Sequence, residues 1–222
     1  MPRPFTARQW LTSFVRSQVL ATANSSLNPY LEVALVSGRL VLNSTQANYS
    51  YGGLERAFAD CFAELELARR PFATALLLGF GAGSVAALLR QSHPRCVLTG
   101  VEADPVVAEL YQRYFALRPA PQLVVAEAAA YLADAARAWQ RYELVVIDLF
   151  IDTQVPATCD TPAFLTALDG VLAPGGLCIW NRLLQPPAAG AATRAFEPTV
   201  RKYYPQLQVY DTLTNRFWSW RG

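Results

Sequence analysis

The chain has 222 residues, of which 53% are hydrophobic and 16% charged, and its formal net charge is +2. This length and composition suit a large globular core and exclude a disordered chain. Lys202 is the only lysine among 19 basic residues, and no stretch clusters arginines, so we expect no nucleic-acid partner. The four cysteines lie far apart without a C-x-x-C pair, which predicts no metal site and a reducing, cytoplasmic location. The N-terminus has no apolar run, so no secretory signal is expected.

The first part of the chain, residues 1–52, predicts a small unit. Apolar residues spaced for one face predict a helix over the first twenty residues. Two β-type runs, 30–36 and 39–43, flank Ser37-Gly38, and such a dipeptide between apolar runs predicts a hairpin. A polar loop with glycines at its end and then a helix to about Arg70 complete this part.

From Ala73 onward, β-type runs alternate with helical patterns. The predicted strands are 73–79, 96–102, 121–126, 142–148 and 176–181, and the predicted helices are 83–92, 105–117, 127–138, 160–172 and 190–204. This alternation is typical of a parallel sheet covered on both faces. Two final runs, 206–211 and 216–220, are too close for a crossover helix and must pair antiparallel. We predict an α/β fold over residues 53–222: a Rossmann-like, seven-stranded, mostly parallel sheet with a terminal antiparallel hairpin.

An uncharged run of 18 residues, 72–89, is long enough to suggest a membrane span. Glycines at alternate positions interrupt its middle. We therefore interpret it as a buried strand, a glycine turn and an apolar helix, and expect no membrane association.

The most informative motif is the glycine loop after the first of these strands. Residues 76–84 read Leu-Leu-Leu-Gly-Phe-Gly-Ala-Gly-Ser, and the next strand ends on Glu102. Glycines let the backbone approach a ligand, a helix start suits an anion, and a carboxylate at a strand end can accept both ribose hydroxyls. NAD-binding loops share these features, but here the third glycine comes one position early for G-x-G-x-x-G and no second nucleotide-binding half follows. The sequence therefore favours S-adenosylmethionine or a close relative.

Four segments in order resemble the class I methyltransferase family, and more closely its spermidine-synthase branch. They are residues 76–85, 100–107, 142–150 and 172–177. The N-terminal hairpin and the Gln46 loop share the resemblance, which covers about residues 28–220. It implies the fold, an adenosyl cofactor and transferase activity, but not the substrate, because one fold hosts many reactions.

The motif and the resemblance together give a set of site residues. Gly79, Gly81 and Gly83 would hold the amino-acid end of the cofactor, and Glu102 its ribose; the alternatives are a plain turn and a solvated strand end. The resemblance adds Gln46, Ala103, Glu127, Ala128 and Asp148 as cofactor contacts, although Glu127 could instead serve the helix dipole. Asp104 precedes Pro105 and is expected to cap a helix.

Asp148 is also the expected catalytic residue. An alkylamine with a pKa of roughly 10 is protonated at neutral pH, and a nearby carboxylate can position it and help to take its proton. The alternative is a structural carboxylate at a strand end. Tyr49 and Tyr51, in the polar loop, are expected to close the pocket and join the catalytic set; the alternative for this loop is turn packing.

The chain departs from polyamine synthases near the predicted site. Ala82 stands where their glycine loop carries an aspartate. The acidic residues that would bind a polycationic amine are missing after Gln46. Leu-Phe-Ile-Asp152 follows Asp148, in place of a Ser/Thr-Asp-Pro type sequence. An aspartate would repel the carboxylate of ordinary S-adenosylmethionine, whereas alanine tolerates it. We therefore expect this cofactor, with decarboxylated S-adenosylmethionine as the alternative, and not putrescine as substrate.

Three functions remain open. We expect a methyltransferase of small-molecule biosynthesis. The alternative is attack at the cofactor's γ-carbon, by aminopropyl or aminocarboxypropyl transfer or by ring closure, which would release methylthioadenosine. A non-catalytic adenosyl-binding module is the third. The only histidine, His93, is remote from every motif, which disfavours a Ser-His-Asp hydrolase. The resemblance also implies a homodimer as one option.

Overall fold

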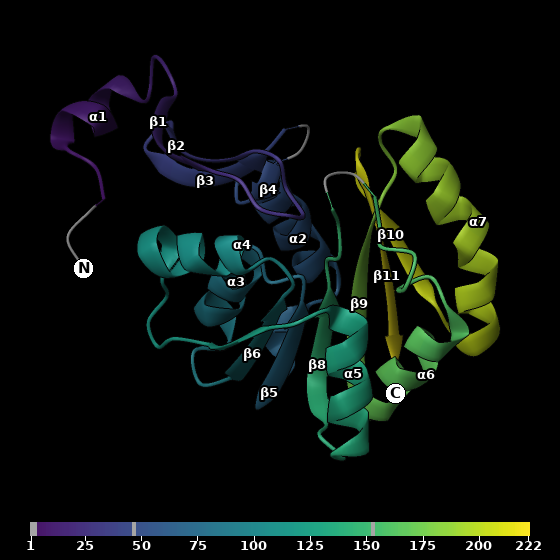
Figure 1. The fold of residues 1–222 in the computed structure, drawn as a ribbon. Helices are drawn as coiled ribbons and strands as arrows, with labels where there is room; N and C mark the ends of the chain where they lie inside the picture. Colours follow the sequence, from purple (N-terminus) through teal and green to yellow (C-terminus); the bar gives the residue numbers. More distant parts are fainter. Residues whose placement is uncertain (1–3, 46–47, 152–153) are drawn as a thin grey trace.

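A computed structural model describes residues 4–45, 48–151 and 154–222, with only the backbone of Asn48 and Tyr49. These residues form two sheets, shown in Figure 1, with strand orders β1-β2-β3-β4 and β10-β11-β9-β8-β5-β6-β7. The smaller, antiparallel sheet consists of β1 (Gln18–Ala23), β2 (Leu31–Val36), β3 (Arg39–Ser44) and β4 (Asn48–Ser50).

An N-terminal helix is present, but it is much shorter than the predicted helix over the first twenty residues. The helix α1 covers only Ala7–Thr12, and the Thr6 hydroxyl caps it by accepting the Gln9 N–H at 3.2 Å. The following residues form β1, which pairs with the apolar strand β2, so tertiary pairing overrides the helical spacing. The predicted hairpin is confirmed: β2 pairs with β3, and both turn residues, Ser37 and Gly38, have positive φ angles, as a two-residue hairpin turn requires.

The predicted seven-stranded sheet is confirmed. Strands β5 to β9 pair in parallel, and β11 runs antiparallel to both β9 and β10. The strand β9 is longer than predicted, because its first residue, Leu172, pairs with Tyr142 of β8 and its carboxyl end pairs with β11 as far as Leu183. The strands are β5 (Thr74–Leu78), β6 (Val97–Glu102), β7 (Gln122–Val125), β8 (Tyr142–Ile147), β9 (Leu172–Leu183), β10 (Gln208–Asp211) and β11 (Asn215–Arg221).

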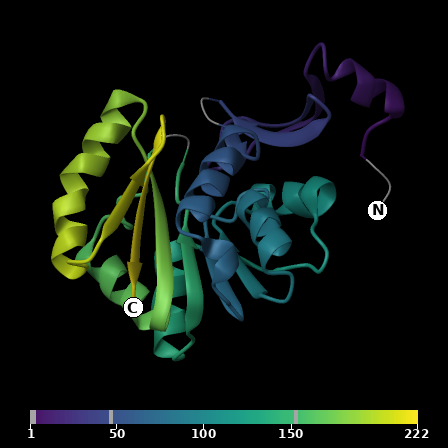
Figure 2. The same ribbon diagram turned by 180° about the vertical axis from the view of Figure 1, so that it is seen from behind.

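Helices cover both faces of the large sheet (Figures 1 and 2). Alternate residues of β5 point to opposite faces: Leu77 packs with α2, α3 and α4, whereas Leu76 and Leu78 pack with α5, α6 and α7. The helices are α2 (Gly53–Glu64), a 3-10 turn (Leu67–Arg69), α3 (Ser84–Ser92), α4 (Pro105–Leu110) continuing as a π-helical turn (Tyr111–Phe115), α5 (Ala128–Arg137), α6 (Pro162–Val171) and α7 (Pro187–Tyr203).

The small sheet packs directly on the large domain. Leu31 and Leu42 of the small sheet belong to one buried cluster with Phe58 of α2 and Leu77 of β5. The division at residue 52 stays a prediction, and this hydrophobic core continues across it.

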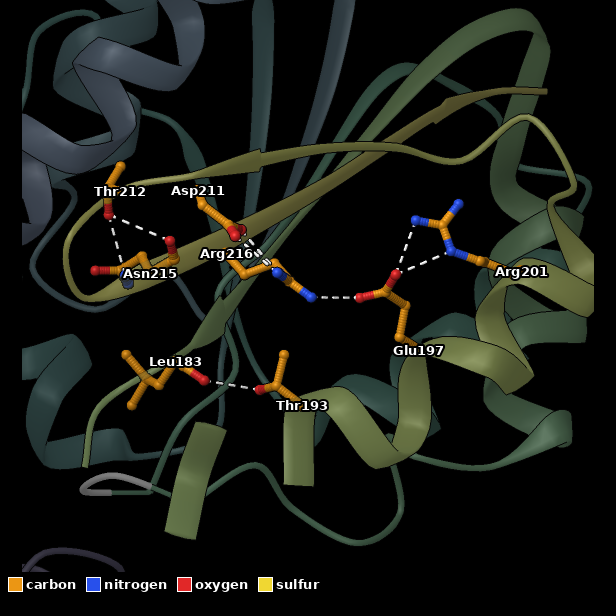
Figure 3. A network of polar contacts seen from close by, with 8 residues as sticks. All are labelled: Leu183, Thr193, Glu197, Arg201, Asp211, Thr212, Asn215 and Arg216. Atoms are coloured by element: carbon orange, nitrogen blue, oxygen red, sulfur yellow. Dashed lines mark hydrogen bonds and ion pairs between the residues drawn. The ribbon is translucent and has the colours of Figure 1, made fainter. Parts of the chain in front are cut away.

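Helix α7 is held against the terminal hairpin by charged side chains. Figure 3 shows Arg216 of β11 between Asp211 of β10 and Glu197 of α7. Its guanidinium donates to Asp211 at 2.7 and 2.8 Å and to Glu197 at 2.7 Å, while Arg201 donates to the other Glu197 oxygen. This network fixes the wall that α7 forms beside the end of β9.

The uncharged run 72–89 folds as the end of a loop, the strand β5, a glycine turn and most of α3. Across the ranges that the structure describes, no helix is both long enough and apolar enough to cross a membrane.

Candidate functional site

A cavity lies at the carboxyl ends of β5, β6 and β8. The chain leaves β5 toward β6 on one side, and β8 lies on its other side, so the strand order reverses here. Open α/β sheets bind ligands at such a point. The predicted site residues that line the cavity are Gly79, Gly81, Glu102, Ala103, Glu127, Ala128 and Asp148.

Gly79 brings the glycine loop into contact with the end of β8. Its φ is +80°, and a Cβ built on it would lie 2.0 Å from the Asp148 carbonyl oxygen. The N–H groups of Gly79 and Phe80 both donate to the Val101 carbonyl, at 3.0 and 2.9 Å. The loop is therefore pinned between β6 and β8, and only glycine fits at its first position.

We expect Gly79→Ala to destabilise the protein by more than about 3 kcal/mol, since backbone overlap adds to left-handed strain of roughly 1–2 kcal/mol. The matched control is Gly175→Ala, which has φ +73° but nothing within 4 Å of its new Cβ. Urea unfolding of both variants measures the difference. Equal losses of stability would show that the contact with Asp148 carries no cost.

Glu102 is a buried carboxyl group, with one oxygen toward the glycine loop and the other toward the start of α4. The side chain is 4% exposed and accepts the Gly81 N–H at 2.8 Å and the Asp104 N–H at 2.9 Å. Burial raises the pKa of Glu102 to about 7, against the lowering effect of the hydrogen bonds from Asp104 and Gly81. A carboxylate held in this way has lone pairs left for further donors from a ligand in the cavity.

Asp148 lies at the end of β8 in a chain of side-chain amides. Asn181 donates its Nδ2 to Asp148 Oδ1 at 2.8 Å, and Asn215 donates its Nδ2 to Asn181 Oδ1 at 2.9 Å. Burial raises the pKa of Asp148 to about 7, while the Asn181 hydrogen bond lowers it. Two cavity carboxyl groups therefore change protonation near neutral pH, which is a frequent property of functional sites.

We expect these two carboxyl groups to make the free protein less stable as pH rises. Their folded pKa of about 7 exceeds the ordinary values of 4.5 and 3.8, so the folded state holds more protons between about pH 4 and 7. We expect stability to fall across that window by about 3 kcal/mol for Glu102, and by less for Asp148, whose partial exposure screens its charge.

Urea unfolding at pH 5 and pH 8 measures this slope. The double variant with Glu102→Gln and Asp148→Asn is expected to flatten the difference between the two pH values. A wild-type slope that persists in the double variant would assign it to other groups.

The small sheet contributes Ser50 to the cavity. Its hydroxyl, on β4, accepts the Ala82 N–H at 3.2 Å and donates to the Ser84 hydroxyl at 3.1 Å. Ser50 is 1% exposed and lines the cavity. The sequence pattern indicates this loop, but not Ser50 in particular. Ala82 itself is buried and lies outside the cavity lining, so the preference for a carboxylated cofactor still rests on the resemblance.

A second contact from the small sheet meets the site beside Glu102. Asp104 caps α4, as predicted, by accepting the Val106 N–H at 2.9 Å. Its other oxygen accepts from Asn28 at 2.8 Å and from Ser25, both in the loop between β1 and β2. This anchor holds Leu27 of the same loop at the cavity, a placement that no local sequence signal indicated.

Four candidates are not placed in the lining. Gly83 turns toward the core, because a Cβ there would meet the Tyr111 ring at 2.9 Å. The Tyr51 ring stacks on Phe115, with centroids 5.4 Å apart, and burial raises its pKa. Gln46 and the Tyr49 side chain lie outside the described residues. Their predicted roles stay predictions.

The cavity combines backbone donors, the three carboxyl groups of Glu102, Glu127 and Asp148, and apolar walls. Within the described part of the chain, no group of three or more histidine, cysteine, aspartate or glutamate side chains could hold a metal ion. The four cysteines are free and buried. The arrangement can bind a ligand rich in hydroxyl or amine donors and can accept a proton at Asp148.

Sequence comparison gives two curated relatives, and no family model matches the chain. A probable polyamine aminopropyl transferase of Bifidobacterium longum is 26% identical over 192 residues, which is 83% of this chain and 42% of that protein. A polyamine aminopropyltransferase of Vibrio vulnificus is 31% identical over 108 residues, 48% of this chain and 36% of the relative. The chain thus spans less than half the length of these relatives.

Solved structures share the fold. A probable spermidine synthase from Corynebacterium glutamicum aligns with a TM-score of 0.65 at 20% identity, covering 93% of this chain and 77% of its own. Human methyltransferase-like protein 13, solved in complex with SAH, aligns with a TM-score of 0.62 at 19% identity, covering 76% and 82%. The chain has a spermidine-synthase-like class I methyltransferase fold.

Proposed function

We propose that the protein is an S-adenosylmethionine-dependent transferase that methylates a small molecule. The observation that carries this proposal is Glu102, a 4%-exposed carboxyl group that lines the cavity beside the glycine loop. A buried carboxylate without a charged partner is costly, and a ribose diol offers it two hydrogen-bond donors. The relatives and structural neighbours named above support a ligand of this class.

The chain's own residues fit such a cofactor. Glu102 would hold the ribose, Ala103 and Glu127 would border the adenine, and the loop from Gly79 to Gly81 would face the amino-acid end. A bound sulfonium cofactor supplies an activated carbon for transfer. Asp148 would accept a hydrogen bond from the acceptor's hydroxyl or amine, orient its lone pair, and take its proton as the new bond forms.

Attack at the γ-carbon is the second candidate function. Both curated relatives are named as aminopropyltransferases, and the alignment with one of them includes 83% of this chain. Against it stands Ala82, at the position where polyamine synthases carry an aspartate. The two reactions leave different nucleosides, so the product distinguishes them.

The test is chromatography of the nucleoside formed from S-adenosylmethionine, with and without a low-molecular-weight metabolite extract as acceptor. We expect S-adenosylhomocysteine that depends on the extract and is lost in Asp148→Asn. Methylthioadenosine formed at a rate that depends on Asp148 would replace the methyl-transfer proposal with γ-carbon chemistry. If neither S-adenosylhomocysteine nor methylthioadenosine is formed, only a binding role is left.

A further inference from the structure

A second cavity adjoins the first at the carboxyl end of β9. Both cavities are lined by Phe150 and Leu183, so they meet at these two residues. One wall of the second cavity is the first part of α7, where Ala192 and Thr193 face it. The Thr193 hydroxyl donates to the Leu183 carbonyl at 2.8 Å, a contact visible in Figure 3 that fixes this wall to β9.

An ion pair between Arg182 and Asp160 forms the charged part of this second cavity. Arg182 donates from both terminal nitrogens to the two oxygens of Asp160, at 2.6 and 3.0 Å. The Arg182 side chain is 1% exposed, and its guanidinium carbon lies 5.3–5.5 Å from the ring centres of Trp180, Phe196 and Trp218. Such a planar, caged group cannot move to meet a ligand.

Asp160 is the accessible member of the pair. Its side chain is 27% exposed, and each oxygen keeps a lone pair beyond the one that Arg182 uses. Because Arg182 neutralises its charge, Asp160 presents a fixed hydrogen-bond acceptor without a net negative field. It is the only acidic side chain among the described residues that line this cavity.

Two further lining residues are polar: Gln154, which is exposed, and Thr193, whose hydroxyl already donates to Leu183. The others are apolar, with Phe150, Val155, Pro186 and small alanines of α7. An anion has no donor for the lone pairs of Asp160, and a diamine finds no uncompensated carboxylate among the described lining residues for either of its charges. A compact apolar body that carries one donor group satisfies both the walls and Asp160.

We propose that this second cavity is the acceptor subsite, and that it takes a small molecule with an apolar body and one hydroxyl or amine that donates to Asp160. This inference rests on the proposed function, which places the reacting carbon in the adjoining cavity. It names the acceptor class that the first cavity alone leaves open, and it separates this chain from enzymes that act on linear diamines.

The test is calorimetric titration of the full chain saturated with S-adenosylhomocysteine, with benzyl alcohol, benzylamine, benzoate and putrescine as probes. The blocking variant is Ala192→Phe, which puts a ring into the cavity from an exposed position of α7. The matched control is Ala191→Phe, one residue away, exposed and outside the cavity lining. Asp160→Ala is not used alone, because it would leave Arg182 buried and unpaired.

We expect benzyl alcohol or benzylamine to bind wild type and Ala191→Phe alike, and to bind Ala192→Phe at least tenfold more weakly. Benzoate and putrescine should bind at least tenfold more weakly than the better benzyl probe. If both benzyl probes fail to bind, or bind Ala192→Phe normally, or if benzoate or putrescine binds as well, the proposal is overturned. Failure of S-adenosylhomocysteine itself to bind would overturn the proposed function as well, which separates the two cases.

Discussion

Glu102→Gln is expected to weaken binding of S-adenosylhomocysteine by roughly 30- to 150-fold at pH 8. Two hydrogen bonds to a carboxylate would become two weaker bonds to a neutral amide, a loss of about 2–3 kcal/mol in total. The new amide nitrogen would also face one of the two backbone N–H groups, of Gly81 or Asp104, that the carboxylate accepts. Calorimetry with this unreactive nucleoside measures the loss without needing the acceptor.

The control for this variant is Glu127→Gln. Glu127 also lines the cavity, but its side chain makes no capping hydrogen bond at the start of α5. We expect its effect on the dissociation constant to stay below about tenfold, because one hydrogen bond at most is weakened. Equal effects of the two variants would argue against the ribose assignment of Glu102.

The same interaction predicts a pH dependence of binding. Burial raises the pKa of Glu102 to about 7, and only the charged form can accept both ribose hydroxyls. Affinity should therefore fall by about tenfold from pH 8 to pH 6, since one proton must leave before the ligand binds. Glu102→Gln should lose this part of the dependence, whereas Asp148→Asn should keep it.

Asp148→Asn is expected to lower kcat by about 100- to 10,000-fold, the usual range for loss of a positioned general base. The asparagine carbonyl can still accept from Asn181, whose amide donates to Asp148 at 2.8 Å, so the fold and the cavity should persist. Binding of S-adenosylhomocysteine should change by less than about threefold at pH 8, where Glu102 is charged.

The wild-type rate should rise with pH through about 7, because burial raises the pKa of Asp148 to about 7 and only its charged form takes a proton. Asp134→Asn, on the exposed surface of α5, is the matched control and should leave kcat unchanged. A normal kcat in Asp148→Asn, with the pH profile intact, would assign the base to another group.

The large sheet could be predicted because its strands are apolar on both faces. The run from Leu144 to Ile147 reads as a buried parallel strand from its composition alone, and β8 is found there. The strands β1 and β4 were missed, because each lies at an edge of the small sheet and takes its conformation from its neighbour. Local pattern therefore specified the central strands better than the edges.

The site was partly predictable for the same reason. Gly79 and Asp148 come directly after β5 and β8, and Glu102 is the last residue of β6. The carboxyl ends of these three parallel strands meet at one edge of the sheet. The sequence could not show that Gly83 turns toward Tyr111 or that Tyr51 stacks on Phe115, since both depend on packing between distant segments. Ser50 at the glycine loop is likewise a contact between segments 32 residues apart.

The most direct test of the central claim is calorimetric titration of wild type and Glu102→Gln with S-adenosylmethionine, decarboxylated S-adenosylmethionine and NAD. We predict one S-adenosylmethionine per chain, tighter binding than that of the decarboxylated form, no binding of NAD, and a strong loss of affinity in Glu102→Gln. Binding of NAD with no binding of either sulfonium nucleoside, or unchanged affinity in Glu102→Gln, would contradict an adenosyl sulfonium site at the carboxyl ends of β5 and β6.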